Sequence, residues 1–156
     1  FGTNLRMTEM QAAIGRLQLQ KLPQWLTARR SNASILTKEF SLVPGLRVTI
    51  PPKNIQHAYY KYYVFVRPEK LKVGWSRDRI MSALMEDGVP CFSGTCSEVY
   101  LEKAFEVKDF RPAERLPAAQ ELGETSLMFL VHPTMTPENM QKIVSAVKKV
   151  MAEATQ

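Results

Sequence analysis

Residues 59–67 read YYKYYVFVR, a run dense in aromatic and β-branched side chains. Such residues are enriched in strands because they pack well on a pleated, half-buried surface. The run therefore predicts the strongest strand of the chain. Two shorter apolar runs predict further strands: residues 46–50, which end at Pro51-Pro52, and residues 126–131, which lead into His132-Pro133. A short extended piece is expected at residues 89–92.

The first forty residues predict helix. Thr8 and Gln11 have the spacing of a capping box, in which each side chain satisfies a backbone N–H at the start of a helix. Pro23 interrupts the pattern because it has no N–H to donate, and a second helix is predicted over residues 24–40. One kinked helix and two helices in a corner both fit this pattern. The first part carries one apolar stripe at helical spacing: Met10, Ala13, Ile14 and Leu17.

Further helices begin at capping residues. Ser76 caps one helix, and Thr136-Pro137 opens the last helix of the chain. Short helices are also predicted at about residues 98–105 and at residues 116–122, the second stopped at Gly123.

The order of these elements predicts an α/β fold class. We expect a two-layer small domain with a mostly antiparallel sheet covered on one face by helices, preceded by one long or kinked N-terminal helix pair. Residues 1–156 then form a single domain, with the N-terminal helices in residues 1–42 and the α/β part in residues 43–156.

Composition limits the setting of the protein. The chain has 156 residues, of which 45% are apolar, enough for a real core. No run of about eighteen apolar residues occurs, so no membrane span is predicted. The start at Phe1, without Met or a signal-type segment, suggests an internal or cut start. Cys91 and Cys96 are too few for a disulfide scaffold, and a cytoplasmic location is expected.

The net charge of +6 favours anionic partners such as nucleic acid, acidic lipid or phosphorylated small molecules. The positive residues are scattered, however, which argues for a solvated surface and against nucleic acid. The tyrosines at positions 59, 60, 62 and 63, with Lys61, can stack a base beside a positive charge. On a strand, the same pattern more often buries one aromatic face and exposes the other.

Few residues carry chemistry by themselves. His57 and His132 are interpreted as ordinary, partly buried histidines, and the two cysteines have no second Cys/His pair to complete a zinc site. Residues 92–97 precede a predicted helix, so they can hold an anion, but a capping turn is the simpler interpretation. The residues alone therefore predict no catalytic residue and no metal ligand.

Asn4 and Arg6 stand apart from these candidates. They precede the helix cap and alternate with Leu5, so both side chains project on one side if the entry is extended. An amide beside a guanidinium suits a phosphate or a carboxylate. The alternative is a local turn with a surface ion pair.

Several segments, read together, resemble a known family. NLRMTEMQAAI at residues 4–14, LPAA at residues 116–119 and HPTMT at residues 132–136 are similar to the sugar aminotransferases of the DegT/StrS type. The resemblance covers nearly the full chain. It implies the C-terminal part of a fold type I enzyme that depends on pyridoxal phosphate (PLP), with the PLP-binding lysine in an N-terminal part absent from this chain.

The resemblance also implies an activity and a site. Family members transfer an amino group from an amino-acid donor, commonly glutamate, to a keto sugar attached to a nucleotide, and they work as homodimers. Asn4 matches the asparagine that reaches across the dimer to the PLP phosphate of the neighbouring subunit. Arg6 matches the arginine two positions on, which supports that interface. We therefore expect cofactor binding at Asn4 and Arg6, and no activity from this segment alone.

Other points stay open. Residues 91–96 read CFSGTC where many members carry a His-Tyr word for sugar contact, so the sugar, the nucleotide, a 3- or 4-amino product and the substrate-binding residues are not assigned. Two alternatives remain: a basic nucleic-acid-binding module, and a structural dimerisation domain that pairs through the apolar stripe of residues 10–17.

Overall fold

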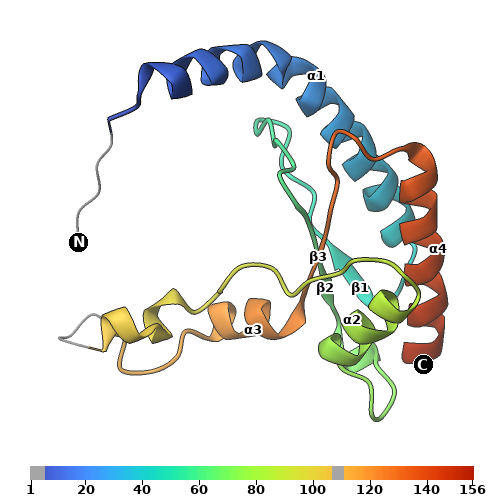
Figure 1. Ribbon diagram of the computed structural model, residues 1–156. Coiled ribbons are helices and arrows are strands. Elements are labelled where there is room, and N and C mark those ends of the chain that lie inside the picture. The colour runs from blue at the N-terminus through green and yellow to red at the C-terminus, as the bar shows by residue number, and fades with distance from the viewer. Residues whose placement is uncertain (1–5, 107–110) are drawn as a thin grey trace.

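A computed structural model describes residues 6–106 and 111–156 of the chain. Over these ranges the fold is α/β, as predicted, with a three-stranded antiparallel sheet at its centre. Figure 1 shows an open, C-shaped molecule. A long helix arcs over the top, the sheet and three packed helices form the right-hand side, and an arm carrying α3 extends below.

The sheet has the order β1-β2-β3, with β1 at Leu46–Val48, β2 at Tyr62–Val66 and β3 at Ser126–Phe129. Both pairings are antiparallel, with Arg47 opposite Phe65 and Tyr63 opposite Met128. All three strands are shorter than predicted. The prediction of strand over residues 59–61 was wrong because Tyr59 has a φ of +46°, which turns the backbone out of the extended region.

The opening helix is continuous. α1 runs from Glu9 to Phe40 with Pro23 inside it, so the two predicted helices are one helix, which curves in Figure 1. The predicted capping box is confirmed: Gln11 N–H donates to Thr8 Oγ1 at 3.3 Å, and Thr8 N–H donates to Gln11 Oε1 at 2.9 Å.

Three helices cover one face of the sheet. The inward side chains of β2 and β3 pack against the second half of α1, against α2 (Arg77–Glu86) and against α4 (Pro137–Ala154). The predicted caps are confirmed, because Ser76 and Thr136 accept from the backbone N–H groups of Arg79 and Asn139. The largest side chains buried in this layer come from all five elements: Leu36, Phe40, Tyr62, Ile80, Leu84, Leu127, Phe129, Met140 and Met151.

The other face of the sheet is only partly covered. α3 (Pro117–Thr125) lies on this side, where Ala118, Ala119 and Leu122 share a cavity with Tyr63 and Phe65 of β2. Helices therefore lie on both faces, whereas the sequence predicted one.

Two smaller predictions also change. The prediction that this helix stops at Gly123 was wrong: α3 continues to Thr125, and Ser126 N–H donates to the carbonyl of Leu122. The missing side chain of Gly123 leaves room for Ser97, because a Cβ there would lie 2.3 Å from Ser97 Oγ. The predicted helix at 98–105 is two 3₁₀ turns, Val99–Leu101 and Lys103–Phe105. Throughout the described ranges no helix is long and apolar enough to cross a bilayer.

Candidate functional site

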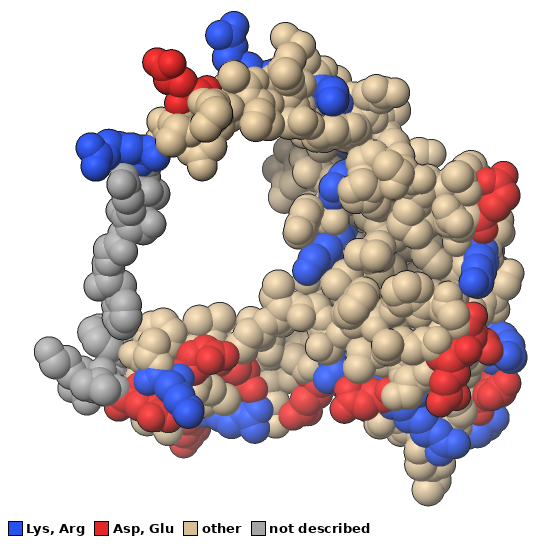
Figure 2. Space-filling view, viewed as in Figure 1, with Lys and Arg blue, Asp and Glu red and all other residues tan. Residues whose placement is uncertain are grey.

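The concave side of the molecule is the candidate site. Figure 2 shows a wide hollow between the first half of α1 above and the α3 arm below, closed on the right by the body around the sheet. Two loops reach this side: residues 55–61, before β2, and residues 93–98, after α2. Polar and aromatic side chains of both loops meet around Thr95, so these two segments make up the candidate site.

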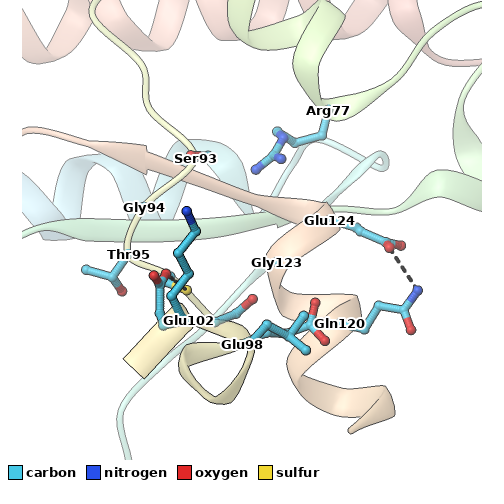
Figure 3. Close-up of a pocket in the computed structure, with 13 residues that line it drawn as sticks. Arg77, Ser93, Gly94, Thr95, Glu98, Glu102, Gln120, Gly123 and Glu124 are labelled. Atoms are coloured by element: carbon cyan, nitrogen blue, oxygen red, sulfur yellow. Dashed lines mark hydrogen bonds between the residues drawn. The ribbon is translucent and has the colours of Figure 1, made fainter. Parts of the chain in front are cut away.

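The 93–98 loop forms one wall of a cavity of about 480 Å³. Figure 3 shows Arg77 projecting from α2 towards this space, with Glu98, Gln120 and Glu124 on the opposite side. Arg77 is engaged, because Nη1 donates to the carbonyl of Ser126 at 3.1 Å and Nε donates to Asp78 Oδ1 at 2.6 Å. The side chain is 15% exposed, so its charge is held at the inner end of the cavity.

Gly94 sets the path of this loop. Its φ is +91°, and a Cβ at this position would lie 2.5 Å from Cε1 of Tyr63. The loop backbone therefore lies directly on the tyrosine ring, an approach that only glycine permits. The helix expected after residues 92–97 is only the three-residue turn at Val99–Leu101, and no side chain caps it. The structure therefore offers no support for the anion-binding alternative, and the preferred interpretation as a capping turn lacks its capping bond.

An ion-pair network fixes the loop to the start of α3. Arg115 pairs with Glu98 through two contacts, one of them Nε to Oε1 at 2.9 Å, and Tyr100 Oη donates to the same oxygen at 2.6 Å. Tyr100 Oη in turn accepts from Leu116 N–H at 2.9 Å. Hydrogen bonds from Arg115 and Tyr100 lower the pKa of Glu98 to about 2, so this carboxylate stays ionised.

The 55–61 loop makes a sharp corner that α1 holds in place. Nη1 of Arg29 donates to the carbonyls of Tyr59 at 3.2 Å and Tyr60 at 2.9 Å, and Nε of Arg30 donates to the carbonyl of His57 at 3.1 Å. Tyr59 N–H donates to His57 Nδ1 at 3.1 Å. These bonds stabilise the left-handed conformation of Tyr59, which costs a non-glycine residue about 1–3 kcal/mol.

The predicted state of the histidines was wrong. Both are exposed: His57 packs its ring against Tyr59, and Nδ1 of His132 lies 2.9 Å from Thr134 Oγ1. Each imidazole ring contacts a residue two positions further along the chain, so its polar atoms are satisfied locally without burial in the core. Of the cysteines, Cys91 is buried and burial raises the pKa of its thiol to about 12, while Cys96 is exposed.

Only Tyr62 and Tyr63, the two tyrosines inside β2, divide as the strand pattern predicted. Tyr60 lies outside the strand, and alternation would have placed it on the buried face with Tyr62. Tyr62 is buried, with its hydroxyl 3.1 Å from Thr37 Oγ1, and burial raises its pKa. Tyr63 is half-buried under Gly94, and Tyr60 is 74% exposed.

The two residues expected to bind cofactor precede α1 in the sequence. Asn4 is outside the described residues. Arg6 is exposed, two residues before the N-cap of α1. In Figure 1 this helix begins at the end of the arc farthest from the sheet, across the hollow from the two loops. The predicted role of Asn4 and Arg6 therefore stays a prediction.

Sequence reasoning missed Arg29 and Arg30 as holders of the corner. A signal was present, because Arg29 lies four residues before the buried Ala33, on the face of α1 that packs on the sheet. A charged residue at a core-facing helical position indicates a partner, and here the partners are loop carbonyls.

Comparisons with known proteins agree on a family. Residues 1–148 match the DegT/DnrJ/EryC1/StrS aminotransferase family. An aminotransferase of known structure from Psychrobacter cryohalolentis is 49% identical, with a TM-score of 0.89, over 98% of this chain and 41% of that one. The dTDP-4-dehydro-2,3,6-trideoxy-D-glucose 4-aminotransferase of Saccharopolyspora spinosa is 25% identical over 97% of this chain and 36% of its own length.

A more distant structure shares the fold. GDP-4-keto-6-deoxymannose-3-dehydratase, solved with a trapped PLP-glutamate geminal diamine, is 21% identical with a TM-score of 0.75, over 94% of this chain and 37% of that one. The chain thus spans about 40% of the length of such relatives. Because the family match extends over nearly all of its residues, the chain belongs to the DegT/DnrJ/EryC1/StrS aminotransferase family.

Proposed function

We propose that this chain is the C-terminal domain of a PLP-dependent aminotransferase that moves an amino group from an amino acid, glutamate foremost, to a nucleotide-linked keto sugar. The observation that carries the proposal is the family match over residues 1–148, together with coverage of only 41% of an aminotransferase at 49% identity. The named sugar substrate of the Saccharopolyspora relative supports the substrate class. The proposal also holds that residues 1–42 and residues 43–156 form one domain. It further holds that the enzyme is cytoplasmic.

The described residues do not complete a site for PLP. When bound, PLP supplies the electron sink for amino-group transfer through a lysine Schiff base. A lysine for that task is normally desolvated in a pocket, and no lysine in residues 6–106 or 111–156 is buried. As the family resemblance implies, the cofactor lysine belongs to the part of the relatives that this chain does not span.

This chain contributes donors and a wall to the complete enzyme. Asn4 donates its amide to the PLP phosphate of the neighbouring subunit in a homodimer, with the Arg6 guanidinium supporting that contact, because an amide and a guanidinium both suit a phosphate. The loops at residues 55–61 and 93–98 form the wall of the substrate cleft. Their fixed shape, set by Arg29 and by Gly94, orients the substrate and excludes water.

The experiment compares this chain with the complete protein that carries it. With glutamate, PLP and a nucleotide-linked 4-keto sugar, the complete protein is expected to release 2-oxoglutarate, measured by a coupled dehydrogenase assay. The 156-residue chain alone is expected to release none. Release of 2-oxoglutarate by the isolated chain, or failure of the complete protein with keto sugars carrying each of several nucleotides, would contradict the proposal.

One observation favours a second role, as a dimerisation domain. The apolar stripe on the first half of α1 is exposed, with Met10 at 77%, Ile14 at 59% and Leu17 at 57%. Such a contiguous apolar surface is typical of a protein contact. Sedimentation of the isolated chain tests this role: association is expected to increase with concentration, and a strict monomer at high concentration would exclude pairing through this surface.

A further inference from the structure

An exposed aromatic ring with two neighbouring cations marks the tip of the 55–61 loop. The ring of Tyr60 is 74% exposed. Cζ of Arg29 lies 5.5 Å from its centroid, and Nζ of Lys61 lies 5.6 Å from it. Cations at this distance are attracted by the negative face of the ring, so both charges lie beside the exposed ring at the same surface.

No described carboxylate balances these charges. Within residues 6–106 and 111–156, no Asp or Glu oxygen lies within 4.0 Å of Arg29, Arg30 or Lys61. Six other basic residues are paired with a carboxylate: Arg47, Arg77, Arg111, Arg115, Lys148 and Lys149. The positive charge at the corner is thus available to an anionic ligand. The bonds from Arg29 to the loop use only Nη1, so Nε and Nη2 of the guanidinium can donate to that ligand.

The corner also has a defined shape. Arg29 and Arg30 hold three carbonyls of the loop, and Tyr59 is fixed in its left-handed conformation. Beside Tyr60 and Lys61 lies a cavity of about 420 Å³, which extends to Thr95 of the other loop. A loop already held in one conformation loses little entropy when a ligand binds, so this surface is suited to binding.

We propose that this corner binds the nucleoside diphosphate portion of the substrate. Lys61 and Arg29 contact the diphosphate, and the base stacks on the exposed ring of Tyr60. The chemistry matches each group: guanidinium and ammonium are donors for phosphate oxygens, and an exposed aromatic ring stacks a base without reading its identity. The inference rests on the proposed function, because that function supplies a substrate with a nucleoside diphosphate. The sugar attached to the diphosphate then lies at the other side of the cavity, next to Thr95.

Calorimetric titration of the complete protein tests the proposal without any turnover. The probes are dTDP, UDP, inorganic pyrophosphate and uridine, at low and at physiological salt. Lys61→Gln is expected to lower the affinity for dTDP, UDP and pyrophosphate about tenfold, which is the contribution of one charge-assisted hydrogen bond. Tyr60→Ala is expected to lower the affinity for dTDP and UDP about tenfold. The affinity for pyrophosphate is expected to stay unchanged, because only the base loses its stacking partner.

Two matched variants control for charge and for the ring. Lys142→Gln removes one exposed positive charge on α4, outside both loops, and is expected to bind every probe as the wild type does. Tyr60→Phe keeps the ring and is expected to retain the affinity for dTDP. The side chains of Tyr60 and Lys61 are exposed and half-exposed, so their substitution is not expected to disturb the fold. Thermal unfolding midpoints equal to that of the wild type would verify this.

The outcomes separate this inference from the proposed function. If the complete protein transaminates keto sugars but Lys61→Gln and Tyr60→Ala bind all probes normally, the corner is not the subsite and the inference is wrong. If no keto sugar is turned over but the probes bind with the expected pattern, the subsite stands and the reaction is wrong. If a single-stranded oligonucleotide binds this corner more tightly than dTDP, the ligand is nucleic acid and the inference is overturned.

Discussion

At the scale of residues, single contacts decide the shape of the concave side. Gly94 lets a loop lie on the ring of Tyr63, and Gly123 lets Ser97 approach α3. Arg29 holds the corner at Tyr59 from a position on the packed face of α1. Each contact depends either on the absence of a Cβ atom in glycine or on a single side-chain donor that bridges two elements. One substitution can therefore abolish it.

Gly94→Ala is expected to destabilise the fold by about 1–3 kcal/mol, from left-handed strain and from the close approach to Tyr63. Urea unfolding of the wild type and the variant measures this. Gly15→Ala is the matched control, because nothing lies within 4 Å of a Cβ there and alanine favours a helix. Equal unfolding midpoints for Gly94→Ala and the wild type would contradict the packing of the loop on Tyr63.

The Glu98–Arg115 pair predicts a pH dependence of stability. The pKa of Glu98 is lowered to about 2 in the folded chain, from an ordinary value of 4.5. A lowered folded-state pKa stabilises the fold above the ordinary value, and this stabilisation is lost as the pH falls from about 4.5 to about 2. Unfolding midpoints across this range are expected to fall less steeply for Glu98→Gln than for the wild type.

Glu102→Gln provides the comparison for that experiment, since Glu102 is a neighbouring carboxylate without an ion pair among the described residues. Its midpoints are expected to follow the wild type over the whole range. A wild-type curve as shallow as that of Glu98→Gln would show that the pair with Arg115 does not persist in solution.

At the scale of elements, the second half of α1 joins the helical layer to the sheet. Phe40 is fully buried, with its ring centroid 5.5 Å from that of Phe129 and 6.1 Å from that of Tyr62. The first half of the same helix extends away from this core in Figure 1 and exposes its apolar side chains. One helix therefore serves two purposes, a packed anchor and an exposed surface.

Phe40→Ala is expected to lower the free energy of unfolding by about 3–5 kcal/mol, because it removes a buried ring and leaves a cavity between α1 and β3. Leu42→Ala, two residues later at 70% exposure, is expected to change it by less than about 0.5 kcal/mol. Chemical unfolding of the three proteins makes the comparison. Similar losses for both variants would contradict the packing of α1 on the sheet.

At the scale of the whole molecule, the open C shape suits a part of a larger assembly. The hollow in Figure 2 is bordered by the exposed half of α1 and by the arm that carries α3. The relatives are more than twice as long as this chain. We infer that their additional residues fill the hollow and complete the active site.

Ile14→Glu tests whether the stripe on α1 makes a protein contact. A carboxylate at the centre of the stripe has to be desolvated in any interface, so concentration-dependent association is expected to weaken by at least about tenfold. Sedimentation equilibrium of the chain measures this. Leu19→Glu introduces the same charge on the opposite side of α1, at a side chain that is 66% exposed, and is expected to associate as the wild type does. Equal association of both variants would contradict the assigned surface.

The sequence alone determined features that depend on local periodicity and on short words. Capping residues at Thr8, Ser76 and Thr136, and the alternation through Tyr62–Val66, act over a few neighbouring residues, so their elements were predictable. The family was readable for a related reason, because contiguous segments such as residues 4–14 carry it. The fold class followed from the order of those elements.

The tertiary structure decided what depends on residues far apart in the chain. The continuity of α1 through Pro23, the turn at Tyr59 and the extension of α3 past Gly123 could not be read locally. Arg29 reaches Tyr60 across thirty-one positions, and that distance in sequence leaves no periodic trace. Hydrogen bonds and packing between distant segments outweigh local propensity, since one such contact is worth as much as the propensity differences of several residues.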